Sequence, residues 1–158
     1  MFYYSPAISS PAVAAELGLV YVTSNDGVLH AFDTATGEVK WEYDGKKLGY
    51  SSPLYHDGRV YCAIGDEGNV FCFDAKTGQL AWRAATNNVI YDSSFTHANG
   101  KVFIGSVNGT FNAIDAASGN LLWQYRLGPG HLFASPAADN DRVYIASLSG
   151  RVTALPVK

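Results

Sequence analysis

A ten-residue unit occurs three times along this chain at a constant interval, and that interval limits the possible folds more than any other feature of the sequence. The unit reads FDTATGEVKW at residues 32–41, FDAKTGQLAW at 73–82 and IDAASGNLLW at 114–123, so its copies begin 41 residues apart. A second series, Gly27, Gly68, Gly109 and Gly150, keeps the same spacing through a fourth unit. The 158 residues are therefore four copies of one structural unit, and the last copy stops within LPVK.

Each unit contains short runs of β-branched and aromatic residues separated by Gly, Asn, Asp and Ser. In the first unit these runs predict antiparallel strands A to D near residues 8–14, 19–23, 28–32 and 39–43. Runs such as VYCAI and VFCF are apolar at nearly every position, which indicates sheets that are buried on both faces. Face-to-face stacking of four-stranded sheets with this period is typical of β-propeller blades.

The predicted fold is therefore all-β, a propeller with four blades per chain whose last blade lacks strand D. The blades are expected at about residues 8–44, 50–85, 92–126 and 133–158 together with 1–5.

The most regular residues of the unit are expected to be structural. They are Asp33, Gly37, Trp41, Asp74, Gly78, Trp82, Asp115, Gly119 and Trp123. An Asp at the end of strand C accepts hydrogen bonds from nearby backbone N–H groups, and the Gly takes a positive φ. The Trp is large enough to fill the space between neighbouring blades. Because identical residues at identical repeat positions indicate architecture, we assign no catalytic residue among them.

Composition excludes several classes of protein. Hydrophobic residues make up 47% and charged residues 16%, with a formal net charge of −3, which fits a folded domain and provides no basic face for nucleic acid. No apolar run approaches the roughly 18 residues of a membrane span. The N-terminal sequence MFYYSPAISSP lacks the basic and apolar regions of a signal peptide. We expect a soluble chain, either a mature form or a piece of a longer protein.

The motif also resembles a known repeat. The pattern A-x-D-x-x-T-G-x-x-x-W, preceded by V-Y-V-x-S-x-D-G-x-L, is carried most fully by residues 20–41 and with substitutions by 60–82 and 102–123. It is similar to the repeat of quinoprotein alcohol dehydrogenase-like β-propellers, also called pyrroloquinoline quinone (PQQ)-like repeats, which share the architecture of WD40 and YVTN propellers. The resemblance implies a bacterial protein in the periplasm or another extracytoplasmic compartment.

That family includes quinone-dependent dehydrogenases, an outer-membrane assembly lipoprotein with a propeller scaffold, and sensor portions of bacterial receptor kinases. Its dehydrogenases use PQQ, a calcium ion with Glu and Asn ligands, a catalytic Asp and, in many members, two adjacent cysteines. Here Cys62 and Cys72 are ten positions apart, and four units stand where those enzymes have eight blades. We therefore expect no catalytic residue, no metal and no cofactor. PQQ and calcium are expected as cofactors only under the alternative interpretation, in which the chain is a quinone-dependent oxidoreductase or a fragment of one.

Departures from the repeat are the better indicators of a binding site. In propellers of this type the connection from strand D to the next strand A leads toward the central channel, and Asp92 there replaces aromatic or apolar counterparts. Together with Tyr50, Tyr91, His131 and Phe133 it predicts a channel mouth that binds a small polar ligand or a peptide. The alternative is that these residues are only loop tips.

The leading functional hypothesis is a non-catalytic binding or scaffold module for a protein or peptide. The alternatives are the quinone-dependent oxidoreductase and the extracytoplasmic sensor domain of a receptor kinase. For Cys62 and Cys72, which replace apolar residues on neighbouring strands, buried free thiols are favoured over a cross-strand disulfide or a reactive role.

The ends of the chain are complementary in repeat position. The fourth unit stops before strand D, and residues 1–5 fall where a strand D would precede the first unit. Three assemblies satisfy this offset: a closed four-bladed monomer, a head-to-tail homodimer with eight blades, and a piece of a longer propeller. A dimer or larger ring is favoured, because four blades demand a larger rotation between neighbouring sheets, and an unclosed ring leaves exposed sheet edges.

Overall fold

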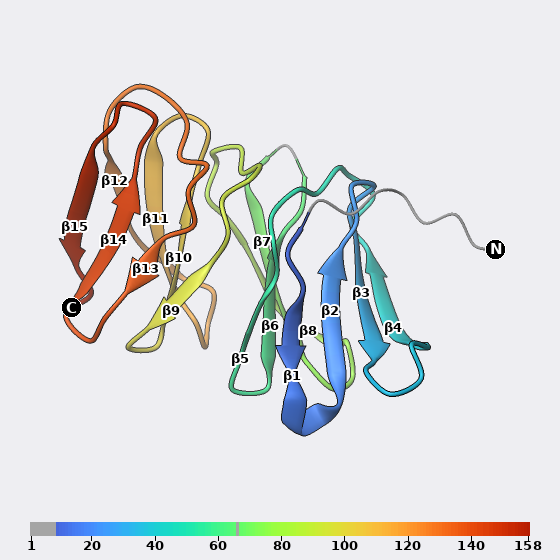
Figure 1. Cartoon of the computed structure of the whole chain (residues 1–158). Helices are drawn as coiled ribbons and strands as arrows, with labels where there is room; N and C mark the ends of the chain where they lie inside the picture. Colours follow the sequence, from blue (N-terminus) through green and yellow to red (C-terminus); the bar gives the residue numbers. More distant parts are fainter. Residues whose placement is uncertain (1–8, 66) are drawn as a thin grey trace.

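Four antiparallel sheets, one per repeat, stand side by side as blades (Figure 1). The computed structural model describes residues 9–65 and 67–158. The first three blades have four strands each and the fourth has three, and sequence neighbours always pair within a sheet. The predicted all-β propeller with four repeat blades, the last of them short of one strand, is confirmed.

The strands follow the order of the chain. Blades 1 and 2 contain β1 (Ala12–Ala14), β2 (Leu19–Thr23), β3 (Val28–Asp33), β4 (Val39–Asp44), β5 (Leu54–His56), β6 (Arg59–Ala63), β7 (Asn69–Asp74) and β8 (Leu80–Ala85). Blades 3 and 4 contain β9 (Thr96–Ala98), β10 (Lys101–Gly105), β11 (Thr110–Asp115), β12 (Leu121–Arg126), β13 (Ala137–Ala138), β14 (Arg142–Ala146) and β15 (Val152–Pro156). A 3-10 turn, η1 (Ala15–Leu17), follows β1. The described residues contain no helix with the length and apolarity that a bilayer span requires.

The first strand of blade 1 is shorter than the sequence predicts. The strand expected at residues 8–14 is β1 at Ala12–Ala14. The residues before the first strands bond to neighbouring blades: Ser10 N–H donates to Ser52 Oγ at 2.8 Å, Ser51 Oγ donates to Ser93 O at 2.7 Å, and Ser93 Oγ donates to Ala134 O at 3.4 Å. The recurrent serines before strand A are thus links between blades, a role that the sequence did not reveal.

The hydrophobic core is divided into three clusters, each lying between adjacent blades. Tyr21 and Phe73 are fully buried between blades 1 and 2, Val70 and Ile104 between blades 2 and 3, and Phe103 with neighbours between blades 3 and 4. Within residues 9–65 and 67–158 no such cluster joins blade 4 to blade 1, and these two blades lie at opposite ends of the row in Figure 1. The described residues therefore form an open arc. The predicted closing strand at residues 1–5 lies outside the described residues.

The recurrent Asp, Thr or Ser, and Gly form the corner between the third and fourth strands of a blade. Asp33 Oδ1 accepts from the N–H groups of Ala35 and Thr36, each at 2.9 Å. These backbone bonds, and then Lys40, lower the pKa of Asp33 to about 2. At Asp74 and Asp115 the hydroxyl groups of Thr77 and Ser118, and then the backbone N–H groups of the same two residues, lower the pKa of the carboxylate. Each carboxylate is therefore held as a charged acceptor inside its own turn.

The recurrent Trp links each corner to the blade before it. Trp41 Nε1 donates to Ala75 O at 2.9 Å, and Trp82 Nε1 donates to Ala116 O at 3.1 Å. The Trp41 ring lies directly over Gly78, where an added Cβ would come within 2.6 Å of Trp41 Cδ2. The glycine is therefore required twice, for its φ of 72° and for the indole that covers it.

Candidate functional site

The connections between blades and the second-to-third-strand hairpins lie together at one end of the array, uppermost in Figure 1. We call this end the loop face. Each connection is bonded to hairpins of the blades that it joins: Gly49 N–H donates to Asn25 O at 3.2 Å, and Gly65 N–H donates to Leu48 O at 2.9 Å. The loop face is therefore held by backbone hydrogen bonds to rigid strands.

The second glycine series lies beneath these connections. A Cβ at Gly27, Gly68 or Gly109 would come within about 2 Å of a backbone carbonyl of the connection above it, with 1.5 Å to Lys47 O as the shortest approach. At Gly150, which no described connection crosses, nothing lies within 4 Å. Because Gly27, Gly68 and Gly109 have no side chain, the connections can lie in direct contact with the hairpins beneath them.

The structure gathers the predicted mouth residues into two aromatic pairs on the loop face. Tyr50 and Tyr91 meet edge to face with ring centroids 5.7 Å apart, and both are half-buried. His131 and Phe133 meet edge to face at 4.7 Å, and both are exposed. Asp92 is exposed next to Tyr91. In the described ranges no hydrogen bond or ring contact joins the two pairs to each other or to Asp92. The mouth thus remains a prediction, now with a defined geometry.

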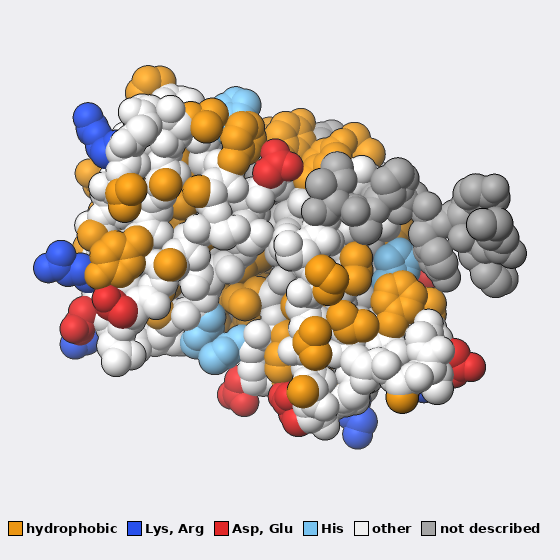
Figure 2. All heavy atoms as spheres, viewed as in Figure 1, with side chains coloured by type: hydrophobic (Ala, Val, Ile, Leu, Met, Phe, Trp, Pro, Cys, Tyr) orange, Lys and Arg blue, Asp and Glu red, His pale blue; other side chains and the backbone are white. Residues whose placement is uncertain are grey.

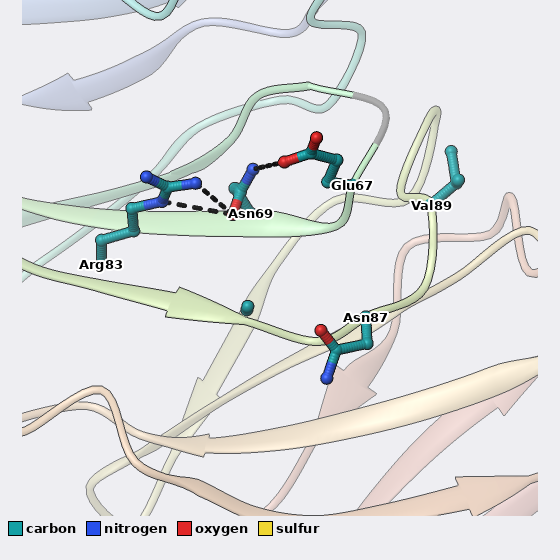
Figure 3. A pocket seen from close by; sticks show the side chains of 6 residues that line it. Glu67, Asn69, Arg83, Asn87 and Val89 are labelled. Carbon is teal, nitrogen blue, oxygen red and sulfur yellow. Dashed lines mark hydrogen bonds between the residues drawn. The ribbon is translucent and has the colours of Figure 1, made fainter.

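A pocket of about 440 Å³ lies beside this surface and was not predicted (Figure 3). It is lined by Glu67, Asn69, Arg83, Ala85, Asn87 and Val89. Arg83 Nε and Nη2 donate to Asn69 Oδ1 at 3.2 and 2.9 Å, and Asn69 Nδ2 donates to Glu67 Oε2 at 3.4 Å. The guanidinium also lies 5.7 Å from the centroid of the Phe71 ring. Arg83, Asn69 and Glu67 therefore form hydrogen bonds with one another. These bonds use part of the hydrogen-bonding capacity that the pocket could offer to a ligand.

A signal for this pocket is present in the sequence. Arg83 pairs across the ladder with Phe71, where the other blades pair Glu42 with His30 and Gln124 with Asn112. His30 Nδ1 lies 3.5 Å from Glu42 Oε2, and Gln124 Nε2 donates to Asn112 Oδ1 at 2.8 Å. Each of the first three blades thus carries its own complementary pair at one repeat position. A comparison of cross-strand partners, rather than of single positions, identifies this variable site.

The two cysteines are free and buried on opposite faces of blade 2. Cys62 belongs to the core with blade 1, whereas Cys72 belongs to the core with blade 3. Side chains on opposite faces of one sheet cannot form a disulfide. This geometry therefore excludes the cross-strand disulfide and agrees with buried free thiols. Burial raises the pKa of Cys62, and it raises the pKa of Cys72 to about 11. Both thiols stay protonated at neutral pH, which makes them poor nucleophiles.

Two histidines outside the loop face, His56 and His97, stack on each other. The rings of His56 and His97 are 3.6 Å apart between centroids with an interplanar angle of 22°. They line a second cavity, of about 400 Å³, between blades 2 and 3 at the end opposite the loop face. Within residues 9–65 and 67–158 no group of three or more His, Cys, Asp or Glu side chains has a geometry suited to a metal ion.

The histidine stack predicts a loss of stability in mild acid. Burial, and then the neighbouring His56, lower the pKa of His97. A lowered folded-state pKa contributes stability in full above the unfolded-state value of about 6.5, and that stability is lost as the pH falls toward the folded-state value. The free energy of unfolding from urea titration should therefore decrease between about pH 7.5 and about pH 5. His97→Phe should reduce this decrease, while the matched change His131→Phe on the loop face should not. Equal pH dependence in both variants would contradict the assignment.

Comparisons with known proteins agree with this architecture. The family model described as "Outer membrane protein assembly factor BamB" matches residues 5–89 and 66–158. No curated protein matches the sequence. Among solved structures, BamB from Moraxella catarrhalis superposes with a TM-score of 0.81 at 20% identity, covering 96% of this chain and 50% of that one. The chain thus spans half the length of BamB.

Two further solved structures share this fold. The computationally designed Ika4 protein superposes with a TM-score of 0.85 at 18% identity, covering 99% of this chain and 94% of Ika4. The quinohemoprotein alcohol dehydrogenase ADHIIG from Pseudomonas putida HK5 superposes with a TM-score of 0.78 at 23% identity, covering 90% of this chain and 28% of that one. At these identities the likenesses establish the fold alone.

Proposed function

Because this chain belongs to the family of PQQ-like repeat β-propellers whose model describes the assembly factor BamB, we propose that it is a non-catalytic binding or scaffold module for a protein or peptide partner. The observation that carries this proposal is the loop face, where the aromatic pairs Tyr50–Tyr91 and His131–Phe133 are displayed by backbone-bonded connections. Aromatic side chains on a rigid framework are suited to protein recognition, because they offer a large contact area at low entropic cost.

The polar groups of the repeat support a structural rather than a catalytic role. Asp33, Asp74 and Asp115 accept hydrogen bonds within their own corners, and both thiols are buried and protonated. A quinone-dependent oxidoreductase is the second candidate, and the likeness to ADHIIG favours it at the level of fold. Incubation with PQQ and calcium, followed by a dye-reduction assay with alcohols and sugars, distinguishes the two, because turnover would overturn the scaffold proposal.

The proposed setting follows from the same family. The description of the family model names an outer membrane assembly factor, which supports an extracytoplasmic location. We also include a second copy of this chain among the proposed partners, with two copies completing an eight-bladed ring. The chain covers 50% of BamB and 45% of the designed Ika8 protein, so each of those chains is about twice as long as the matched region.

Binding through the loop face can be tested with a displayed library of random peptides. Peptides selected on the wild-type protein should lose at least about tenfold in affinity for the variants Tyr91→Ala and Phe133→Ala, because central aromatic residues dominate such interfaces. The matched control is Leu80→Ala, since Leu80 is also an exposed apolar residue, at 45%, but lies at the far end of blade 2. Retention of full affinity by both aromatic variants would exclude the loop face as the site.

A further inference from the structure

A polar cavity lies between blades 2 and 3 at the end of the array opposite the loop face, and the proposed function does not use it. Its volume is about 400 Å³. Its walls are the hairpin between β5 and β6, the hairpin between β9 and β10, and the corner between β11 and β12. Histidine side chains, pale blue in Figure 2, gather between β5 and β9 in this region. We call it the histidine cavity, after His56 and His97 in its lining.

The walls of the histidine cavity are tied together by hydrogen bonds between the two blades. Ala116 O, in the corner of blade 3, accepts from Trp82 Nε1 at 3.1 Å and from Tyr61 Oη at 3.4 Å, and both donors belong to blade 2. Ala116 N–H donates to Gly100 O at 2.9 Å, which joins the corner to the neighbouring hairpin. The cavity is therefore formed before any ligand arrives, and a preformed site lowers the entropic cost of binding.

Asp57 in this lining departs from the repeat. Its counterparts in blades 3 and 4 are Asn99 and Asn140, and Asn99 Nδ2 donates to Asn140 O at 2.6 Å, which links those two blades. A carboxylate has no hydrogen to donate, so Asp57 cannot form the same link to Asn99 O. Asn would suit the left-handed backbone at this position, where φ is 44°, equally well. Among the described residues the Asp57 side chain has no hydrogen-bond or ion-pair partner, so its carboxylate is an unused acceptor.

Arg59 supplies unused donors to the same cavity. It lies across the ladder from Asp74, but Asp74 Oδ1 accepts from Thr77 N–H at 2.9 Å and from Thr77 Oγ1 at 2.8 Å within its own corner. The Arg59 guanidinium forms no hydrogen bond or ion pair in the part of the chain that the structure describes. Asp57 and Arg59 belong to one hairpin, and both are exposed. The cavity thus contains one positive and one negative group that do not pair with each other.

The stacked histidines add neutral polar groups between these two charges. In the ladder, His56 occupies the position of Ala14 in blade 1 and of Ala98 in blade 3, so it also departs from the repeat. Burial and then the neighbouring His56 lower the pKa of His97, while the carboxylate of Asp57 raises it by less, so the His97 ring is neutral at neutral pH. Neither ring hydrogen-bonds to another described residue. A neutral imidazole can donate one hydrogen bond and accept another, so the stack can serve either end of a dipolar ligand.

We propose that the histidine cavity binds a free α-amino acid, with Arg59 holding the α-carboxylate and Asp57 holding the α-ammonium group. A zwitterion matches a lining whose two formal charges are opposite, whereas a metal cation would meet Arg59 and a phosphate would meet Asp57 as a like charge. Ala116, Ala117 and the ring of Tyr61 offer an apolar wall to the ligand side chain. The volume lies within the range of about 300 to 1,000 Å³ typical of small-molecule sites. This site goes beyond the proposed scaffold function and does not depend on it.

Isothermal titration calorimetry of the full chain tests the ligand class. Each common L-α-amino acid is titrated separately at neutral pH, together with ZnCl₂ and inorganic phosphate. At least one amino acid should bind. Its N-acetyl derivative, which lacks the ammonium group, and its amide derivative, which lacks the carboxylate, should each bind at least about tenfold more weakly, because each loses a charge-assisted hydrogen bond. Binding of zinc or phosphate without binding of any amino acid, or no binding at all, would overturn the proposal.

Two variants assign the residues. Asp57→Asn should weaken amino acid binding at least about tenfold and remove the preference over the N-acetyl form. Its free energy of unfolding should not decrease, because the new amide can form the link to Asn99 O, so lost binding would not reflect lost folding. Arg59→Gln should remove the preference over the amide form, whereas the matched change Arg83→Gln in the other polar pocket should leave binding unchanged. Unchanged affinity in Asp57→Asn would refute the site. Tyr91→Ala on the loop face should also keep its amino acid affinity, which separates this result from the scaffold proposal.

Discussion

Gly78→Ala is expected to cost far more stability than Gly37→Ala, although both glycines have a φ of 72° in equivalent corners. The left-handed backbone alone costs an L-residue about 1 to 2 kcal/mol, and this is the whole expected effect at Gly37, where no atom lies within 4 Å of an added Cβ. At Gly78 the Cβ would come within 2.6 Å of Trp41 Cδ2. Displacement of this packed indole adds about 1 to 3 kcal/mol of overpacking strain.

The pair of glycine variants separates backbone strain from contact between blades. Urea unfolding followed by fluorescence gives both free energies, and the difference between the variants measures the contact with Trp41. Gly119→Ala provides a second test, because its Cβ would meet Trp82 Cδ2 at 2.6 Å. Equal losses at Gly37 and Gly78 would show that the indole moves aside without cost, and the proposed double role of the glycine would be wrong.

Trp82→Ala is expected to be the most destabilising of the single changes considered, at about 3 to 5 kcal/mol. The indole packs on Tyr61 with centroids 5.9 Å apart, covers Gly119 and donates to Ala116 O. Its removal leaves a cavity between two blades and takes one of two donors from that carbonyl, since Tyr61 Oη also donates to it.

Trp123→Ala is the matched comparison at the open end of the arc. Trp123 packs on Phe103 and Phe111 within blade 3 but lines the groove beside β15. We expect roughly half the loss of Trp82→Ala, because hydrophobic stabilisation scales with the apolar area removed from water. Both losses come from the same urea titration. A loss at Trp123 as large as that at Trp82 would show that the open end is as well packed as a complete junction.

The order of strands within each blade was predictable because it depends on local chemistry. Tight turns need glycine at positive φ, and buried strands need β-branched or aromatic residues, so the predicted strand at residues 19–23 agrees with β2, Leu19–Thr23. The first strand of blade 1 was predicted too long, because the serines before it bond to the neighbouring blade, as the equivalent serines of the later blades also do. Such bonds join residues about 41 positions apart, and a reading of local composition cannot show them.

The candidate site was less predictable than the fold. The sequence correctly placed Tyr50, Tyr91, His131 and Phe133 in the connections, but their grouping into two edge-to-face pairs depends on the rotation between blades. The stack of His56 on His97 depends on the same rotation, and each ring separately is typical of a solvated turn. The pocket around Arg83 required knowledge of the cross-strand register that sets Arg83 opposite Phe71.

The sequence by itself therefore determined the repeat, the four strands of a complete blade and the Asp-Gly-Trp corner, because each of these follows from backbone conformation and alternating burial over a few residues. Only the tertiary structure decided how the blades meet. It showed that the indole of one repeat covers the glycine of the next, that Cys62 and Cys72 face different cores, and that the four blades form an open arc in residues 9–65 and 67–158. The reason is physical: the angle between stacked sheets is set by side-chain packing summed over a whole junction, and no single stretch of sequence contains both halves of that contact.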